Sequence, residues 1–536
     1  MKLLHTKKFR YGSVSVALTV VVIAAVILFN AVFTALSEKF TWYVDMTPEE
    51  IYTLSDEARD LLDTVPTDRK VTIIFCSPKD ELEAEQTLRY PLYTVLEMVE
   101  DYDNISVRYV DCLTNPSAVA QYKESSGMSI NSYSVIVTSA FSAADPVTGE
   151  VKERTQSRVY AISALYTYNS DSSGSSQIIG YNGEQRLVSA IMAVTQVETP
   201  VACYTKGHGE TDSLVTSTAG SPLLTLLYET GYEVKGIDLI KEDIPANCRL
   251  LVIFNPTSDF MGVNGIGAVN EIAKIEKFLD GSSALMTFFN HETPVLENLE
   301  SLLKDWGVEI CRETVGSETS NYLVKDTQNS FDPDGIINVA TYAENGLGAS
   351  ITRQLMESNY RKPAVFKYST ALKYSSTYET IYDDKNDCFY GAYYSNGISR
   401  DCYDVFTSGS GAIAEAGGSK VADGPFKYMT VTREKQEDLN TGKSIYSYVM
   451  ACASTDFASG DALASSYANH TVLTRACHVI GGAQVSVSLD CKYFSDMEID
   501  SITAVAANQY TIVLTVVPAA LIFIAGVYIM VRRKYA

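Results

Sequence analysis

The segment Gly207-His208-Gly209-Glu210 holds the residue types best suited to chemistry in this chain, and we call it the GHGE segment. It follows a predicted short strand at residues 201–205, and ligands of open α/β sheets bind at the carboxyl ends of strands. His208 could act as a base or metal ligand with Glu210 beside it, and His291-Glu292 lies in another loop of the same region. A His-x-Glu pair alone supplies too few ligands for a metal site.

Three interpretations of the GHGE segment therefore stay open: a structural turn, a binding surface or a catalytic loop. The flanking glycines indicate a special backbone conformation rather than a buried imidazole network, which favours the structural turn. A nucleophile elbow, Gly-x-Ser-x-Gly or its cysteine equivalent, occurs nowhere in the chain. We expect no catalytic residue and no metal site, and Gly207, His208, Gly209 and Glu210 are the candidates for a binding surface.

Two further patterns argue against a cofactor. Thr441-Gly442-Lys443-Ser444 resembles the end of a phosphate-binding loop, but Glu437 stands where that loop needs its first glycine. The 10 cysteines are scattered and form no Cys-x-x-Cys motif. Cys76 and Cys112 each follow a predicted strand, so they could meet at neighbouring strand ends as a disulfide or, as we favour, as two buried free thiols.

Strands and helices alternate on both sides of these residues, which predicts an α/β fold. Residues 37–197 read as an N-terminal extracytoplasmic α/β domain, with a βαβ unit made of strand 71–75, a helix opening at Pro91 and strand 105–110. A further strand is expected at 133–137. The polar, serine-rich stretch 145–176 predicts loops or a hairpin, and a helix follows from Gly183.

A second α/β domain is predicted at residues 198–311, with a doubly wound sheet. Its apolar run at 284–289 is typical of parallel strands covered on both faces. Ser221 and Pro222 suit the start of a helix, and Gly231 suits its left-handed end. Residues 312–425, rich in Tyr, Ser, Asn and Gly, read as an irregular insertion with some β-structure, and residues 426–508 complete the α/β domain.

Two uncharged apolar runs flank this region and predict two transmembrane helices. Val14–Phe33 and Ile512–Val531 are each long enough to cross ~30 Å of hydrocarbon, and basic residues precede the first and follow the second. Both termini are then cytoplasmic by the positive-inside rule, and residues 37–508 lie outside the cell. Residues 1–36 and 509–536 thus form the two anchors of a two-pass cell-membrane protein; a cleaved signal peptide is the alternative for the first run.

Composition narrows the possible partners. The chain has 536 residues and a formal charge of −23, so it lacks the basic excess that nucleic-acid binding requires. The lipid bilayer is the partner that the apolar runs imply. Two helices enclose no transport path, and no nucleotide site is recognisable.

The order of motifs resembles the GldG-type auxiliary subunit of the ABC transport systems first associated with gliding motility. The motifs that carry the resemblance are Ile51-Tyr52-Thr53-Leu54-Ser55, Gly183-Glu184, the GHGE segment, Asn298-Leu299, Trp306-Gly307, Ser454-Thr455-Asp456-Phe457 and Asn469. The resemblance implies a middle domain similar to class I glutamine amidotransferases, with a flavodoxin-like sheet but without their chemistry. Phe278-Leu279-Asp280-Gly281-Ser282-Ser283 departs from the family's usual Tyr-x-x-x-Gly-Gly.

The resemblance also implies the partners: a separate ABC permease and, through it, a cytoplasmic ATPase. The expected function is that of a membrane-anchored, non-catalytic auxiliary subunit of an ABC-type transport system. An extracytoplasmic enzyme with an amidotransferase-like or rhodanese-like sheet and a surface structural protein are the alternatives.

Overall fold

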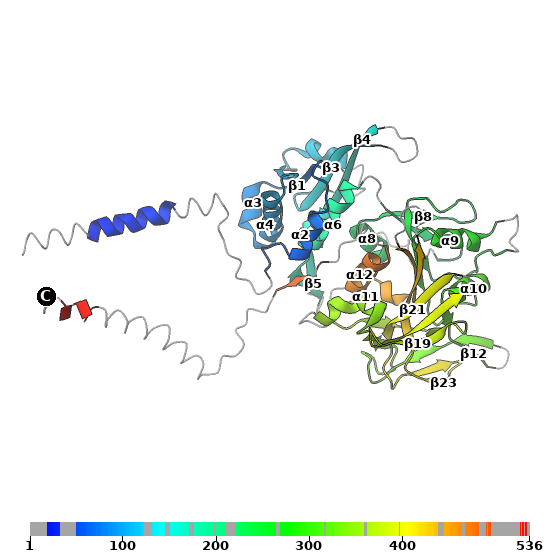
Figure 1. Cartoon of the computed structure of the whole chain (residues 1–536). Helices are drawn as coiled ribbons and strands as arrows, with labels where there is room; N and C mark the ends of the chain where they lie inside the picture. The colour runs from blue at the N-terminus through cyan, green and yellow to red at the C-terminus, as the bar shows by residue number, and fades with distance from the viewer. Residues whose placement is uncertain are drawn as a thin grey trace, which may run out of the picture. The chain divides into compact units, whose positions relative to one another are not determined.

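The computed structural model (Figure 1) divides the chain into two compact units, Met1–Lys492 and Tyr493–Ala536. The residues that the structure describes are 19–32, 50–122, 130–144, 151–170, 176–196, 200–210, 221–263, 269–315, 318–357, 362–395, 397–437, 444–463, 467–481, 489, 491–494, 526, 528–529 and 531–532. The first unit is a mixed α/β protein that contains one four-stranded and one 12-stranded sheet.

The four-stranded sheet has the order β2-β1-β3-β4. Strand β1 (Val71–Phe75) pairs in parallel with β2 (Ile105–Tyr109), and helices α3 (Lys79–Ala84) and α4 (Gln86–Asp101) connect them. The predicted βαβ unit is therefore confirmed. Its strand β1 is almost entirely buried, in keeping with its apolar sequence Val-Thr-Ile-Ile-Phe.

The helix of this unit begins earlier than predicted, because Pro91 lies inside α4 rather than at its start. Proline has no N–H, so the carbonyl of Thr87, four residues earlier, loses its helical partner. The hydroxyl of Tyr166 donates a hydrogen bond to that carbonyl. A side chain from a different element thus compensates the backbone group that proline leaves unpaired.

The polar stretch after β3 (Ser134–Ala144) is mostly strand. β4 (Val151–Ala161) pairs antiparallel with β3 along its whole length, and β5 (Tyr166–Ser170) forms a second hairpin with β6 (Ser176–Tyr181). The hairpin prediction is confirmed, and its polar sequence fits because β4 is the edge strand of its sheet.

Helix α6 (Gly183–Thr195) is buried on nearly every side. It packs against α2 (Asp56–Leu62), α4, β3 and β4 of the N-terminal region and also against α8 (Pro222–Glu229) of the following region. A helix enclosed in this way tolerates polar residues only where they find partners, and Glu184 and Arg186 both do.

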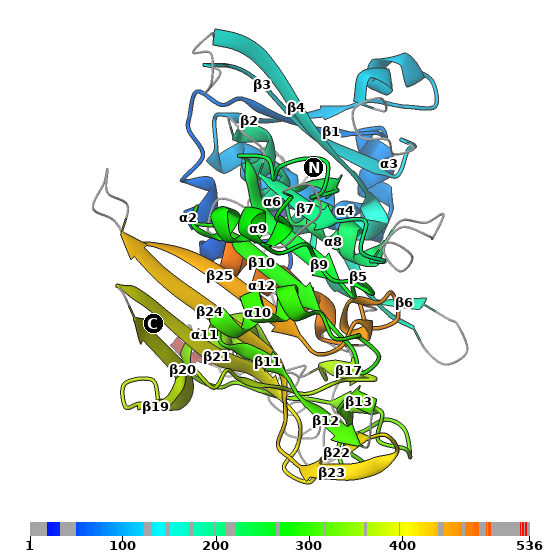
Figure 2. The same cartoon turned by 90° about the vertical axis from the view of Figure 1, so that its right-hand side faces the viewer.

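The large sheet is half parallel and half antiparallel (Figure 2). Its parallel strands, in spatial order, are β8 (Glu233–Ile237), β7 (Val201–Thr205), β9 (Cys248–Phe254), β10 (Ala284–Phe288) and β25 (Ser444–Cys452). The antiparallel strands that continue from β25 are β24 (Lys427–Glu437), β21 (Ile398–Thr407), β20 (Cys388–Ser395) and β19 (Glu379–Asp383).

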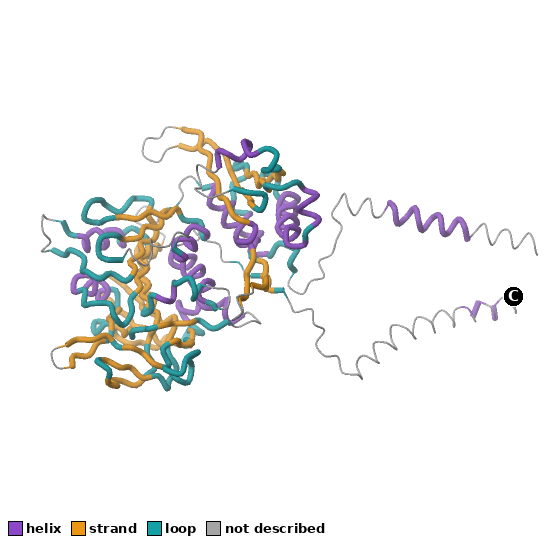
Figure 3. Tube along the Cα trace, turned by 180° about the vertical axis from the view of Figure 1, so that it is seen from behind, coloured by secondary structure: helices purple, strands orange, loops and turns teal. Residues whose placement is uncertain are grey.

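Helices cover both faces of the parallel half, and Figure 3 shows its strands running between them. Alternate residues of β9 and β10 enter two separate apolar clusters: Leu250 and Met286 on one face, Leu251 and Leu285 on the other. The helices over the first face are α8 and α12 (Asn469–Gly481), and those over the second are α9 (Glu271–Leu279) and α10 (Glu297–Asp305). The predicted strand at 284–289, covered on both faces, is confirmed.

The segment 312–425, predicted as an irregular insertion with some β-structure, contributes much of the antiparallel half. Its β18 (Leu372–Tyr374), β19, β20 and β21 belong to the large sheet, as does β16 (Thr341–Tyr342). The other elements of the segment are β12 (Arg312–Val315), β13 (Glu318–Asn321), β14 (Leu323–Lys325), β15 (Ile337–Val339), α11 (Gly346–Glu357), β17 (Val365–Lys367), β22 (Ile413–Ala416) and β23 (Ser419–Asp423). β11 (Val308–Ile310) pairs with β18.

The ends of the first predicted membrane span and most of the second lie outside the described residues. Residues 19–32 of the first run form a helix, and residues 526, 528–529 and 531–532 of the second run and its basic flank are helical. Within the described part of the chain, no helix combines the length and the apolar character needed to cross a membrane.

Candidate functional site

The GHGE segment leaves the carboxyl end of β7, at the edge of the sheet where the parallel strands end. Gly207 and Gly209 have φ values of +113° and +84°, a region that side-chain-bearing residues rarely adopt. A Cβ on Gly209 would also lie 1.8 Å from the Thr257 hydroxyl. The backbone conformation that the two glycines predicted is therefore confirmed, and at Gly209 close approach of the next loop demands glycine as well.

The loop after β9 holds this turn in place. The backbone N–H groups of Thr257 and Ser258 both donate to the carbonyl oxygen of His208, at 2.7 and 3.0 Å. The two loops are therefore joined through one carbonyl oxygen at the edge of the sheet.

The imidazole of His208 is buried in a network of polar contacts, so the expectation of a special backbone conformation rather than a buried imidazole network is wrong in its second part. The residue is 4% exposed and its ring stacks on Phe260 with centroids 3.9 Å apart. Its Nε2 lies 3.0 Å from Glu271 Oε2, and its Nδ1 lies 3.3 Å from Glu210 Oε1. Glu210 also accepts the backbone N–H of His208 at 2.7 Å.

Glu271 is the site residue that sequence reasoning missed. It occupies the first turn of α9, where Asn270 caps the helix, and it is fully buried. Its Oε2 accepts the backbone N–H of Met261 at 2.8 Å, and its own N–H donates to the Met261 carbonyl at 2.9 Å. An acidic residue beside an N-cap usually signals a solvated first helical turn, so nothing local marked Glu271 as the partner of a histidine.

The two carboxylates keep His208 protonated. Burial by itself lowers the pKa of the imidazole, but hydrogen bonding and charge from Glu210 and Glu271 outweigh it and raise the pKa of His208 to about 9. Burial likewise raises the pKa of Glu210, yet its hydrogen bonds, led by the one from His208, bring that pKa below its ordinary value.

This arrangement suits an ion-pair joint better than a reaction centre. An imidazolium whose two nitrogens face carboxylates has no lone pair with which to accept a proton. The side chains of His208 and Glu210 are buried, whereas Gly207 and Gly209 are exposed. The exposed part of the GHGE segment is thus glycine backbone, and the ion pair of His208 with Glu210 lies buried beneath it.

Neighbouring loops at the same edge are tied together by neutral polar contacts. Asn290 Nδ2 donates to Thr455 Oγ1 at 3.2 Å, and the Thr293 hydroxyl donates to Asn255 Oδ1 at 3.1 Å. His291 stacks on Tyr368 and lies beside Glu292, so its contacts belong to a different set from those of His208. Among the residues that the structure describes, no three His, Cys, Asp or Glu side chains are grouped as metal ligands.

Asn469, one of the residues that carry the family resemblance, is a buried bridge. Its amide nitrogen donates to the carbonyl oxygens of Val365 and Phe457 at 2.8 and 3.1 Å, and its Oδ1 accepts the N–H of Val365 at 2.9 Å. It joins α12 to β17 and to the turn that follows β25.

Cys76 and Cys112 meet at the carboxyl ends of β1 and β2, where the N–H of Cys112 donates to the Cys76 carbonyl at 3.4 Å. Both are buried free thiols, as favoured from the sequence. Burial, reinforced by Cys112, raises the pKa of Cys76. The thiol of Cys76 is therefore not an activated nucleophile.

Comparison with known proteins adds little to this geometry. No protein-family model and no curated protein matches the chain. Among solved structures, Cytoplasmic Protein STM3548 from Salmonella typhimurium matches with a TM-score of 0.22 and 10% identity, covering 51% of this chain and 98% of that one. This likeness is too distant to carry an argument about fold or function.

Proposed function

We propose that this chain is a membrane-anchored, non-catalytic auxiliary subunit of an ABC-type transport system. In this proposal the two apolar runs cross the membrane, both termini are cytoplasmic, and the α/β region faces the outside. The permease and the ATPase are separate chains. The parallel half of the large sheet is the amidotransferase-like module of the GldG-type subunits.

The observation that carries the proposal is the role of the residues that resemble the family. Ser55 of the 51–55 motif donates to Glu184 of the Gly183-Glu184 motif at 2.7 Å, and Asn469 bridges the turn that contains Phe457. The buried His208 of the GHGE segment pairs with Glu271 of α9 at 3.0 Å. These residues join segments that are distant in the sequence, which supports a scaffold that presents surfaces to partners.

The described part of the first apolar run supports the membrane anchor. Within the helix at residues 19–32, large apolar side chains such as Ile27 and Phe29 are 63% and 67% exposed. Apolar side chains left uncovered in such number favour contact with lipid or with another apolar surface.

The first experiment tests the partners. The chain is purified in mild detergent through a tag, with its candidate permease and ATPase co-expressed, and the bound proteins are identified by mass spectrometry. We expect a polytopic permease and, with it, an ATPase. Recovery of the chain alone in several detergents would refute the transporter assignment.

A second experiment tests the topology. Protease added to intact cells should digest the α/β region and leave the two short ends protected, because only residues 37–508 are exposed in the proposed arrangement. Digestion confined to the termini would refute it.

A third experiment tests the absence of acyl-transfer chemistry. We expect no turnover of glutamine or ester substrates by the full chain, because such chemistry needs an activated nucleophile beside its base. A turnover that disappears when one cysteine is replaced by serine would favour the enzyme alternative instead.

A further inference from the structure

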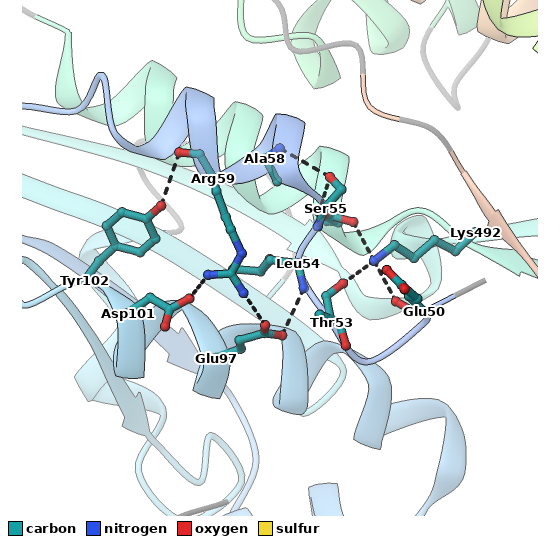
Figure 4. A network of polar contacts seen from close by, with 11 residues as sticks. Glu50, Thr53, Leu54, Ser55, Ala58, Arg59, Glu97, Asp101, Tyr102 and Lys492 are labelled. Carbon is teal, nitrogen blue, oxygen red and sulfur yellow. Dashed lines mark hydrogen bonds and ion pairs between the residues drawn. The ribbon is translucent and has the colours of Figure 1, made fainter. Parts of the chain in front are cut away.

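The ammonium group of Lys492 sits in a cradle made by residues from the opposite end of the first unit. Its Nζ lies 2.8 Å from Glu184 Oε2 and donates to the carbonyl oxygens of Glu50, at 2.9 Å, and Thr53. The Lys492 side chain is 12% exposed. Figure 4 shows the lysine reaching into the turn formed by residues 50–55.

The carboxylate of Glu184 is the centre of this cradle. Its side chain is 3% exposed, and a buried carboxylate is tolerated only when donors compensate its charge. Three donors do so: the N–H of Ser55 at 2.6 Å, the hydroxyl of Ser55 at 2.7 Å and the ammonium of Lys492. Lys492 supplies the one positive charge among them.

Ser55 links the cradle to a helix. Its hydroxyl donates to Glu184 and accepts the N–H of Ala58, so the same oxygen caps the N-terminus of α2. The positive φ of Glu50, +48°, belongs to the turn whose carbonyl faces Lys492. The motif Ile51-Tyr52-Thr53-Leu54-Ser55 thus has a structural purpose, because its Thr53 carbonyl accepts from Lys492 and its Ser55 donates to Glu184.

A second carboxylate holds the same turn from the side of α4. Glu97 Oε2 accepts the N–H of Leu54 at 3.0 Å, and its Oε1 lies 2.6 Å from Arg59, which also pairs with Asp101. Glu97 and Glu184 together accept consecutive backbone N–H groups. The two acceptors fix the path of the chain where it enters the α/β region.

We propose that Glu184 and Lys492 form a clasp that fastens the chain's exit from the α/β region to its entry. Residues 50–55 follow the stretch that leads from the first apolar run, and Lys492 precedes the stretch that leads to the second. The clasp ties both to the first turn of α6, so that residues 50–55 and Lys492 are held at one point. Its relevance to the membrane rests on the proposed function, whereas its existence does not.

Helix α6 gives the clasp a connection to the rest of the unit. Arg186, two residues after Glu184, pairs with Glu229 of α8 at 2.6 Å and lies 3.4 Å from His470 Nε2 of α12. A displacement of residues 50–55 or of Lys492 therefore acts on the same helical turn that contacts the second α/β region.

Hydrogen exchange of the full chain in detergent tests the clasp. Replacing Lys492 with methionine removes the charge but keeps most of the stem, so we expect amide exchange at Leu54 and Ser55 to accelerate about tenfold or more, the effect of losing a charged hydrogen bond. Lys492→Arg keeps the cation and should restore most of the protection. Lys373→Met, which removes a surface ion pair with Glu309, is the matched control and should leave residues 50–55 unchanged.

Protection of strands β9 and β10 serves as the internal check that each variant is folded. If Lys492→Met leaves exchange at Leu54 and Ser55 as slow as in the unaltered chain, the clasp is refuted. If Lys492→Arg exchanges as fast as Lys492→Met, the positive charge is not what holds the segments, and the proposal is likewise overturned. Neither result depends on a transporter, so the copurification experiment can succeed or fail independently.

Discussion

Replacing His208 with alanine should destabilise the α/β region strongly and in a pH-dependent way. The substitution leaves Glu210 and Glu271 buried without their cation. Such a site relieves its charge by taking up a proton, which raises the pKa of one carboxyl above its unfolded value. The expected loss of unfolding free energy depends on how far the solution pH lies above the pKa of that carboxyl in the unfolded chain.

The size of this loss in unfolding free energy follows from the ordinary pKa of a glutamate and the raised pKa of His208. Protonating a carboxyl with an ordinary pKa of 4.5 at about pH 6.5 costs roughly 2.7 kcal/mol, at 1.36 kcal/mol per unit. Above that pH the unaltered chain also loses stability. The unfolded chain releases the His208 proton near the ordinary pKa of 6.5, whereas the folded chain keeps it up to a pKa of about 9. The difference in unfolding free energy between the unaltered chain and His208→Ala should therefore rise by about 1.4 kcal/mol per pH unit from about pH 4.5 to 6.5. It should then level off near about 3 kcal/mol.

Urea unfolding of the full chain, followed by tryptophan fluorescence, measures this difference. Trp306 is buried in the same apolar cluster as Phe260, on which His208 stacks, so its emission reports on this side of the sheet. His291→Ala, in a less buried loop histidine, is the matched control and should cost less than about 1 kcal/mol at any pH.

A compensated variant separates charge from packing. Combining His208→Ala with Glu210→Gln and Glu271→Gln removes the groups that titrate at this site, so its stability deficit relative to the unaltered chain should show no slope below about pH 6.5. That deficit should then shrink as the pH rises towards about 9, where the unaltered chain loses the stability that the His208 proton supplies. If His208→Ala unfolds like His291→Ala, or if its deficit is the same at every pH, the imidazolium is not held by these carboxylates and our account of the site is wrong.

Three further outcomes follow from the same contacts. For the unaltered chain, the raised pKa of His208 contributes stability that is complete below its ordinary 6.5 and is lost as the pH rises through about 9, which a pH series of urea midpoints should show. Gly209→Ala should cost at least about 1 kcal/mol more than Gly397→Ala, because both glycines have positive φ but only Gly209 has Thr257 in the way. Asn469→Ala should lower unfolding stability by about 2 to 3 kcal/mol by leaving buried backbone groups without partners, and a thermal shift of less than 2 °C would contradict this.

Local patterns in the sequence determined the elements and their cores. The strands at 201–205 and 284–289, the helix start at Pro222 and the left-handed turn at Gly231 were all predicted and found. Each depends on neighbouring residues alone: a run of apolar side chains, a fixed proline φ or a missing Cβ. The alternation of strand and helix predicted the α/β class for the same reason.

The partners of the buried charges were decided only by the tertiary structure. Glu271 reaches His208 because β7 and β9 lie side by side, and Lys492 reaches Glu184 from the far end of the unit. Pro91 sits inside a helix because Tyr166 satisfies the carbonyl that it frees. No local pattern encodes these contacts, since each depends on the order of strands and on packing between distant segments. The sequence identified His208 as a candidate residue, but only the fold shows that its protonated imidazole is buried between Glu210 and Glu271.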